Sequence, residues 1–382
     1  MVRKKKSTLE HNSEILNADA DTIIQQLTEK YGEGTIFHGG MASESYNKGV
    51  ISTGIFSLDQ ALGVGGLPIG RVIEYYGVEA GGKTSLALKV AVDAMRQGYV
   101  LFFIDLEHAL DRTLASNIGV DVDSPYFCIT QPDFGDQAME IIEAILESKI
   151  KSLIIVDSIS ALLPKEEYEA GFLDPVQPGR QANLMSRSLR KLTPMVSKTD
   201  SMIIFVNQLR STIGPFASTV TSGGKALKFY ASIRLSVNMK DKIDQNGITI
   251  GHSAKVKVVK NKVAAPYHET VLDIFYGSGF SSMSDMLRIA VMNNIVVKSG
   301  AWYAYKEEKI GQGMVNTLQF FLKNPDTYKT IVQETLTFFG LDSSNMEKYR
   351  DKTINFGNTL VTTDQSSPEN ENEVSTEEGE GE

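Results

Sequence analysis

The segment Gly77-Val-Glu-Ala-Gly-Gly-Lys-Thr84 matches the pattern G-x-x-x-x-G-K-[ST] and lies between two stretches of different periodicity. Residues 71–76 (Arg-Val-Ile-Glu-Tyr-Tyr) read as a strand, and residues 84–96 read as a helix. A strand, a glycine-rich turn and a helix in this order form a phosphate-binding loop. The glycines let backbone N–H groups point at phosphate oxygens, and the helix N-terminus adds the positive end of its dipole. The segment therefore predicts a site for a nucleotide phosphate chain.

The side chains of this loop predict ATP and Mg²⁺ as its cofactors. We expect Lys83 to reach the β- and γ-phosphates and Thr84 to hold the magnesium ion. The expected nucleotide-binding residues are Gly77, Val78, Glu79, Ala80, Gly81, Gly82, Lys83, Thr84 and Ser85.

Buried strands alternate with helical stretches, which is the pattern of a parallel sheet covered on both faces. The strands are expected at residues 71–76, 100–104, 152–156 and 202–206, and the helices at residues 84–96, 136–146 and 186–196. Three later runs have alternating polarity and are expected to be antiparallel strands: residues 231–237, 254–259 and 271–275. The predicted fold class is α/β with a mostly parallel central sheet.

Carboxylates follow two of these buried strands. Asp157 ends one of them and is expected to join Thr84 in holding Mg²⁺. Asp105 and Glu107 follow another, where an acid can polarise a water for in-line attack on the γ-phosphate. The spacing alone leaves both acids as candidates.

An amide pair, Asn207 and Gln208, ends a further buried strand, where an amide can sense the γ-phosphate. A loop rich in Ser, Thr and Gly follows, and loops of this length are often functional. A second polar loop covers residues 165–181. The basic side chains in and near both loops predict a patch for a phosphate backbone: Arg180, Arg187, Arg190, Lys191, Arg210, Lys225 and Lys228.

The acidity of the chain is concentrated at its C-terminus. Among 382 residues, 38 Lys and Arg stand against 47 Asp and Glu, a formal net charge of -9. Eight of the acids lie in residues 364–382, which hold no base, so the remainder is almost neutral. The total charge alone argues against nucleic acid. The tail is therefore either a solubilising segment only, or an anionic competitor for a basic surface elsewhere in the chain, such as Arg288, Lys298, Lys306 and Lys309.

The composition, 42% hydrophobic and 22% charged, is typical of a folded globular protein. Cys128 is the single cysteine, which excludes an internal disulfide framework and a multi-cysteine zinc site. No apolar run reaches the roughly 18 residues that a membrane helix needs. The basic start, residues 3–6, precedes no apolar signal segment. We expect a cytoplasmic protein without a membrane partner.

Two further segments allow either a purely structural interpretation or a role at a subunit interface. Ile23, Ile24, Leu27 and Tyr31 fall on one face of a helix, which can dock on its own core or on a neighbouring subunit. The lysines of residues 255–262 indicate either an exposed sheet face or a cationic finger directed at a neighbour's nucleotide.

The order of these motifs resembles that of bacterial and phage RecA-type recombinases. The similarity runs from about Ile24 to Phe321. It includes the phosphate-binding loop and residues 52–59, 61–68, 103–111, 156–158, 207–210, 223–232, 258–262 and 300–313.

This resemblance implies a role for several residues. Glu107 matches the catalytic glutamate, which leaves Asp105 behind it, and Gln208 matches a glutamine that senses the γ-phosphate. Lys260 and Lys262 match lysines that reach ATP across a subunit interface.

The resemblance also implies base, DNA and interface positions. Asp111 and Tyr276 match positions near adenine and ribose, and the loops 165–181 and 209–222 match two DNA-binding loops. The implied DNA-binding residues are Arg180, Arg187, Arg190, Arg210, Ile213, Gly223, Gly224 and Lys225. The implied subunit-interface residues are Ile24, Leu27 and Phe229.

The chain departs from the family pattern at three places. Ala80 and Gly81 replace two serines of the phosphate-binding loop. Leu114 stands where a tyrosine commonly stacks on adenine, and Asn183 stands where an arginine is expected.

The resulting interpretation has four parts: a basic segment with a polymerisation helix (1–49), a RecA-type ATPase core with two DNA loops (50–280), a small α+β domain (281–345), and a linker with a disordered acidic tail (346–382). The implied function is ATP-dependent pairing and exchange of DNA strands. The implied partners are single-stranded DNA, homologous double-stranded DNA, a helical filament of identical subunits, and single-strand-binding and loader proteins. A hexameric RecA-core helicase and a non-catalytic filament that coats DNA are the alternatives.

Overall fold

The computed structural model describes residues 20–32, 36, 48–171, 179–211, 219–356 and 360–362. Its centre is a ten-stranded sheet in the order β12-β11-β10-β9-β3-β7-β6-β4-β5, with β8 paired to β7. The strands are β3 (Val72–Gly77), β4 (Val100–Asp105), β5 (Phe127–Thr130), β6 (Ser152–Asp157), β7 (Met202–Ser211), β8 (Thr219–Thr221), β9 (Ile233–Gln245), β10 (Ile248–Asn261), β11 (Glu269–Phe275) and β12 (Gly279–Phe280).

The strands of the sheet centre are parallel, as their apolar runs predict. Strand β3 pairs in parallel with β7 and β9, and β7, β6, β4 and β5 continue in parallel. Strand β10 is antiparallel to β9 and β11. The expectation that residues 231–237 are antiparallel was therefore wrong on one side, since β9 joins β3 in parallel.

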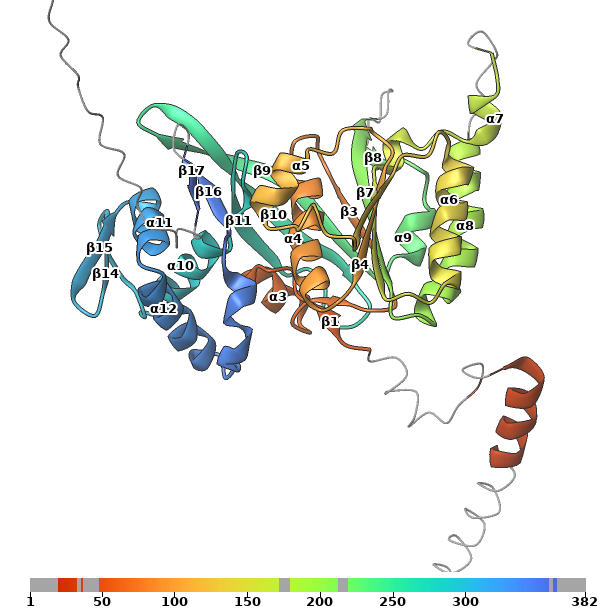
Figure 1. Ribbon diagram of the computed structural model, residues 1–382, viewed down its shortest axis with the longest axis horizontal. Coiled ribbons are helices and arrows are strands. Elements are labelled where there is room, and N and C mark those ends of the chain that lie inside the picture. Colours follow the sequence, from red (N-terminus) through yellow and green to blue (C-terminus); the bar gives the residue numbers. More distant parts are fainter. Residues whose placement is uncertain are drawn as a thin grey trace, which may run out of the picture.

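Helices cover both faces of this sheet (Figure 1). One core contains Leu101, Phe103 and Ile155 and packs against α4, while the other contains Ile104 and Val156 and packs against α6 and α8. Side chains of a strand alternate between its faces, so each buried strand feeds both cores. The helices and short strands of this body are β1 (Val50–Ile51), α3 (Phe56–Leu62), β2 (Leu67–Pro68), α4 (Lys83–Arg96), α5 (Arg112–Ile118), α6 (Gly135–Glu147), η1 (Ile159–Ala161), α7 (Lys165–Tyr168), α8 (Arg180–Ser197) and α9 (Ala226–Tyr230).

Helix α8 begins six residues before the predicted start at Ser186 and contains Pro194 near its end. The polar residues of its first turns hide its start from a search for apolar periodicity. Strands β9 and β10 are likewise longer than the runs 231–237 and 254–259, because their outer halves form a twisted ribbon with mostly polar residues.

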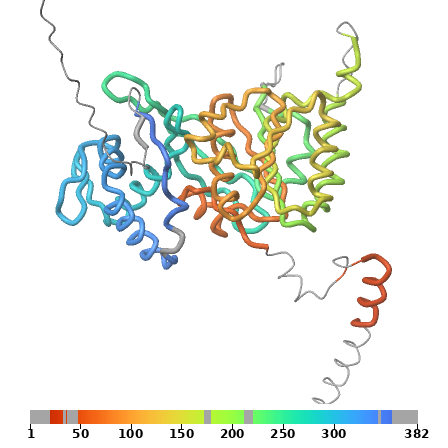
Figure 2. The backbone as a smooth tube through the Cα atoms, viewed as in Figure 1, coloured from red at the N-terminus to blue at the C-terminus, as the bar shows by residue number. Residues whose placement is uncertain are grey.

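A smaller domain follows the sheet, and its core also includes Phe56, Ile250 and Phe275 of the larger body. It consists of α10 (Ser282–Met292), β13 (Val297–Ser299), β14 (Trp302–Tyr305), β15 (Glu308–Gln312), α11 (Met314–Lys323), α12 (Pro325–Phe338), η2 (Ser343–Tyr349), β16 (Thr353–Asn355) and β17 (Leu360–Thr362). The expected linker from residue 346 differs from this arrangement, because Tyr349, Ile354 and Phe356 are buried in that core. Figure 2 shows this segment returning between the small domain and the body that contains the large sheet.

The segment is fixed by a buried ion pair. Asp351 receives Lys89 Nζ of α4 at 2.8 Å and also accepts hydrogen bonds from Ser281 Oγ and from the backbone N–H groups of Ser282 and Met283. Such a carboxylate gives no signal in a composition or periodicity pattern. The acidic tail, residues 364–382, lies outside the described residues.

The predicted N-terminal helix is present at residues 20–31, and Gly32 follows it with a φ of 87°. Ile24 and Leu27 are half-buried, and Ile23 and Tyr31 are exposed. Within the described ranges, none of the helices has the length and apolar character needed to cross a membrane.

Candidate nucleotide-binding and DNA-binding site

The phosphate-binding loop joins β3 to α4 at the carboxyl edge of the sheet. Gly82 has a φ of 92°, and a Cβ there would lie 2.4 Å from Ile274 Cδ1. A Cβ on Gly77 would lie 1.9 Å from Val237 O. Both positions therefore require glycine, one for its backbone conformation and both for the close approach of neighbouring atoms. The loop keeps a backbone cradle although Ala80 and Gly81 replace two serines.

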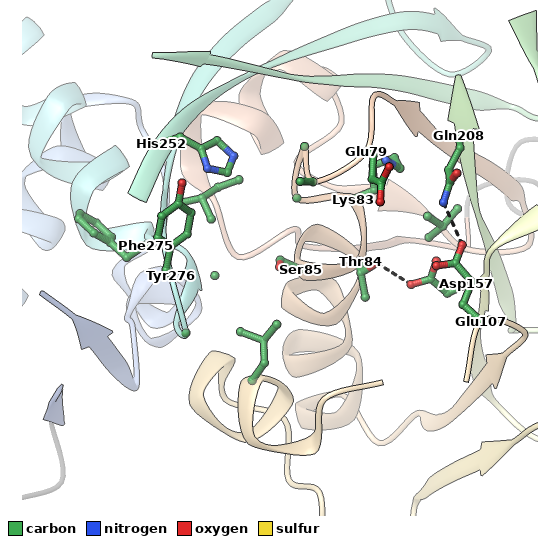
Figure 3. Close-up of a pocket in the computed structure, with 18 residues that line it drawn as sticks. Glu79, Lys83, Thr84, Ser85, Glu107, Asp157, Gln208, His252, Phe275 and Tyr276 are labelled. Atoms are coloured by element: carbon green, nitrogen blue, oxygen red, sulfur yellow. Dashed lines mark hydrogen bonds between the residues drawn. The ribbon is translucent and has the colours of Figure 1, made fainter. Parts of the chain in front are cut away.

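A cavity of about 390 Å³ opens in front of this loop (Figure 3). Its lining includes residues 79–85, so the predicted loop residues are brought together except for Gly77 and Val78, which do not line it. Lys83 Nζ donates to Val78 O at 2.6 Å. Burial lowers the pKa of Lys83, while the carboxylates of Asp157, Glu107 and Glu79 act in the opposite direction. The ammonium is thus held among carboxylates at the phosphate end.

Thr84 and Asp157 meet at the predicted magnesium position. Thr84 Oγ1 donates to Asp157 Oδ2 at 2.5 Å. Burial raises the pKa of Asp157 to about 6, against the hydrogen bond from Thr84 and the charge of Lys83. One hydroxyl and one carboxylate fit Mg²⁺, which keeps waters and substrate phosphates as its other ligands. No group of three His, Cys, Asp or Glu side chains that could hold a metal occurs in the described part of the chain.

The structure separates the two acids that the spacing left open. Asp105 is buried and accepts hydrogen bonds from the backbone N–H groups of Ala109 and Leu110 and from Gln131 Nε2. Glu107 instead is exposed and lines the cavity. Its position allows contact with a water beside the phosphates, whereas Asp105 fixes the loop that carries Glu107.

Glu107 is held by two donors from neighbouring strands. Gln208 Nε2 donates to Glu107 Oε1 at 3.0 Å, and Ser158 Oγ donates to the same oxygen. Gln208 ends the first part of β7, and Ser158 follows β6. The sequence did not single out Ser158, although it directly follows the predicted magnesium ligand.

A buried polar chain supports Gln208 from below. Glu74 of β3 is fully buried, accepts a hydrogen bond from Asn207 Nδ2 at 3.0 Å, and receives Arg234 Nε at 2.5 Å. Asn207 also donates to Ser222 O at 3.0 Å. Charged residues inside otherwise apolar strands were the sequence signal that could have revealed this network of hydrogen bonds.

The opposite end of the cavity is lined by His252, Phe275 and Tyr276, and Leu114 is a further lining residue. Figure 3 shows His252 and Tyr276 at the end away from Glu107 and Gln208. The predicted Asp111 does not line the cavity, because its carboxylate caps α5 by accepting from Thr113 N and Leu114 N. A capping carboxylate and a ligand carboxylate look alike in sequence.

Family models match nearly the whole of this fold. Residues 18–281 match the RecA N-terminal domain, and residues 284–339 match the RecA C-terminal domain. A Protein RecA from Syntrophus aciditrophicus (strain SB) is 46% identical over 323 residues, which cover 84% of this chain and 93% of that protein. A Protein RecA from Cereibacter sphaeroides (strain ATCC 17023) is 43% identical over 329 residues, which cover 86% and 95%. This chain belongs to the RecA family.

The family makes the chain a RecA-type DNA recombinase with a DNA-dependent ATPase, and implies that it binds nucleotide and DNA and forms filaments. A solved structure described as the crystal structure of the RadB recombinase is also similar, at 22% identity and a TM-score of 0.45. The similarity covers 60% of this chain and 98% of the chain in that structure.

The two lysines that the RecA resemblance places across a subunit interface do not line the cavity of their own chain. Lys260 Nζ donates to Lys228 O at 2.6 Å and to Phe229 O at 2.9 Å, and Lys262 Nζ donates to Phe229 O at 3.4 Å. The ring of Phe229 is 70% exposed. The predicted interface residue and the two lysines thus lie together on one surface.

The DNA-binding residues expected from the RecA resemblance lie on α8, at the end of β7 and before α9. Arg187 and Arg190 are exposed on α8, and Arg210 Nη2 lies 3.4 Å from Ser160 O. Arg180 Nε lies 3.4 Å from Glu166 Oε2. Ile213 and residues 172–178 of the first loop lie outside the described residues.

Gln181 links the ends of the two predicted loops, a role that the sequence did not indicate. Gln181 Nε2 donates to Ile159 O at 2.8 Å and to Leu162 O at 3.0 Å, and Gln181 Oε1 accepts from Gly223 N at 3.1 Å. Gly224 packs on α8 so closely that a Cβ would lie 2.7 Å from Ala182 Cβ. The glycines before exposed Lys225 therefore serve packing as well as backbone conformation.

Proposed function

We propose that this chain binds Mg-ATP in the cavity beside the phosphate-binding loop and hydrolyses it to ADP and phosphate in a helical filament on single-stranded DNA. The filament pairs that strand with a homologous duplex and exchanges strands. The observation that carries this proposal is the convergence of Lys83, Thr84 with Asp157, and Glu107 with Gln208 around one cavity.

The phosphate end of the cavity suits hydrolysis of the γ-phosphate. Thr84 and Asp157 would hold Mg²⁺, which neutralises phosphate charge when bound. Lys83 pairs with the β- and γ-phosphates. Glu107 accepts a proton from a water that attacks the γ-phosphorus, while the bond to the bridging oxygen breaks and ADP leaves with the electron pair. The contact from Gln208 orients Glu107 and links it to the loop that follows β7.

The position of Lys260 and Lys262 supports an active site shared between subunits. Both lysines lie outside their own cavity, and we infer from the RecA resemblance that they act on the nucleotide of a neighbouring copy. A contact that joins different surfaces of identical chains and does not close gives an open helical filament. Ile24 and Leu27 of the N-terminal helix and the exposed Phe229 are the interface residues of this arrangement.

The basic residues around the two loops suit a DNA backbone. We assign phosphate contacts to Arg180, Arg187, Arg190, Arg210 and Lys225, with Gly223 and Gly224 holding the loop base and Ile213 inserting between bases. The protein acts in the cytoplasm, and single-strand-binding and loader proteins are its further partners.

ATP turnover with and without single-stranded DNA, followed by strand exchange on homologous and heterologous duplexes, tests this proposal. Turnover should require DNA, and exchange should require homology. Lys83→Ala should abolish turnover, while Lys151→Ala, an exposed lysine at the other edge of the sheet, should not. Turnover indifferent to DNA, or exchange indifferent to homology, contradicts the proposal; processive unwinding by a closed ring supports a helicase instead.

A further inference from the structure

A buried histidine borders the end of the cavity away from the phosphate-binding loop. The side chain of His252 is only 5% exposed, and neither Nδ1 nor Nε2 has a hydrogen-bond partner among the described residues. Buried polar groups in folded proteins are almost always paired, so two unpaired nitrogens on one ring need an explanation. A ligand that supplies the missing partner is such an explanation.

The backbone fixes where this ring lies. His252 is in β10, opposite Ile274 of β11 and Lys242 of β9. The neighbouring Gly251 lets the strands approach closely, since a Cβ there would lie 2.1 Å from Ile274 O. The imidazole is therefore positioned by paired strands on both sides and does not depend on a loop.

The surroundings of His252 suit a flat, partly apolar group. The ring of Tyr276 lies beside it with centroids 5.8 Å apart and planes at 48° (Figure 3). Leu114 is a further apolar residue that lines the cavity. Tyr276 is 46% exposed, so it can turn about its side-chain bonds and admit a base edge to the imidazole. The phosphate-binding groups Thr84 and Asp157 lie at the other end, as a nucleotide requires.

The chemistry of the ring matches a purine edge. Burial lowers the pKa of His252, so the imidazole is neutral near pH 7. A neutral imidazole carries one donor and one acceptor, and the edge of adenine offers an exocyclic N–H donor and a ring-nitrogen acceptor. Leu114 can supply apolar contact but no hydrogen bond.

We propose that His252 is a specificity-determining residue that hydrogen bonds to the base of the bound nucleoside triphosphate. This inference rests on the nucleotide site proposed above. It assigns base recognition to strand β10 in a chain where a leucine occupies the position of the adenine-stacking ring.

His252→Phe is the most informative variant, because it keeps a ring of similar size and removes both nitrogens. Binding of Mg-ATP, Mg-dATP and Mg-tripolyphosphate to the full chain is measured by calorimetry, together with the unfolding temperature without nucleotide. We expect ATP and dATP to bind about tenfold more weakly, the loss of roughly one hydrogen bond. Tripolyphosphate binding should be unchanged, and the nucleotide-free protein should unfold at the same or a higher temperature. His252→Gln, which keeps a donor and an acceptor, should restore most of the affinity.

His268→Phe is the matched control, since His268 is exposed directly before β11 and does not line the cavity. Unchanged ATP affinity in His252→Phe overturns the proposal. An equal loss of tripolyphosphate points to a distorted pocket and also overturns it, and a loss for ATP but not dATP assigns the contact to the ribose. Failure of the unmodified chain to bind ATP instead contradicts the nucleotide site itself.

Discussion

Gln208 Nε2 donates a hydrogen bond to Glu107 Oε1 at 3.0 Å, across the end of the strand that lies between them. This contact joins the proposed catalytic carboxylate to β7, directly before the predicted loop 209–222. Asn207, the residue before Gln208, bonds to Ser222 O at the far end of that loop. We therefore propose that a change at the γ-phosphate that moves Gln208 acts on both ends of the predicted DNA-binding loop.

We expect Gln208→Ala to uncouple ATP turnover from DNA. The variant loses the donor to Glu107 and the amide that we propose meets the γ-phosphate, but it keeps Lys83, Thr84 and Asp157. Stimulation of phosphate release by single-stranded DNA should fall by about tenfold or more, while ATP binding changes little. Gln131→Ala is the control, because it also removes a side-chain amide, but one that donates to Asp105 and not to Glu107. Full DNA stimulation in Gln208→Ala contradicts the coupling.

The two acids after β4 should behave differently when they are neutralised. Glu107→Gln should lower phosphate release by about 10²- to 10⁴-fold, the range for loss of a general base, and leave ATP affinity intact. Asp105→Asn should chiefly lower the unfolding temperature, because Asp105 accepts backbone N–H groups inside the fold. Steady-state kinetics and thermal unfolding on both variants check this assignment, and a reversed pattern would exchange the roles of the two acids.

The centre of the fold could be predicted because the features that indicate it lie within short stretches of the sequence. Strands β3, β4, β6 and β7 are buried on both faces, so each contains a recognisable apolar run, although β7 continues to Ser211, beyond its predicted end at residue 206. A glycine loop between β3 and α4 has few interpretations. The direction of β9 could not be predicted in this way. It depends on β3 lying beside it, a contact between segments far apart in the chain.

The candidate site divides along the same line. Lys83, Thr84, Asp157 and Glu107 stand in motifs, and the structure brings them to one cavity. His252 stands alone in a strand, and nothing in its neighbours separates a ligand contact from an ordinary core histidine. That its two ring nitrogens lack hydrogen-bond partners among the described residues becomes visible only when strands β9, β10 and β11 are in place.

Asp351 should control the acid limit of stability. Burial alone would raise the pKa of Asp351, but Lys89 and the N–H and O–H donors around it outweigh burial and lower it. A carboxylate with a lowered pKa contributes its full stabilisation above the pKa of the unfolded chain, 3.8. This contribution is lost as the pH falls below 3.8 and through the lower pKa of the folded state. Asp351→Asn should cost about 3 kcal/mol at pH 7, because Lys89 is left buried without its partner.

Chemical denaturation from pH 7 to pH 3 measures this effect. The unmodified chain should lose stability toward pH 3, and Asp351→Asn should show a flatter acid limb from a lower starting value. Asp123→Asn removes the partner of Arg112 in an exposed ion pair and should change neither quantity by more than about 0.5 kcal/mol. Parallel acid limbs in the unmodified chain and Asp351→Asn would show that other carboxylates set the limit.

Lys260 should set an alkaline limit on turnover in the filament. Burial, together with the charges of Lys262 and Arg234, lowers the pKa of Lys260 to about 8. The side chain is therefore a cation below that pH and loses its charge as the pH rises through it. If Lys260 pairs with the phosphates of a neighbouring copy, DNA-dependent turnover should fall above pH 8. Lys260→Arg should move this alkaline limb upward, since a guanidinium stays charged throughout the range.

Lys257→Arg is the matched control, because it makes the same exchange on the same strand away from Phe229. The pH profile of phosphate release at saturating DNA and ATP should match that of the unmodified chain in this control. A limb shifted by Lys260→Arg but not by Lys257→Arg ties the alkaline loss to one lysine beside the exposed Phe229. An unshifted limb in Lys260→Arg removes that lysine from the shared active site, whatever the structure of the filament.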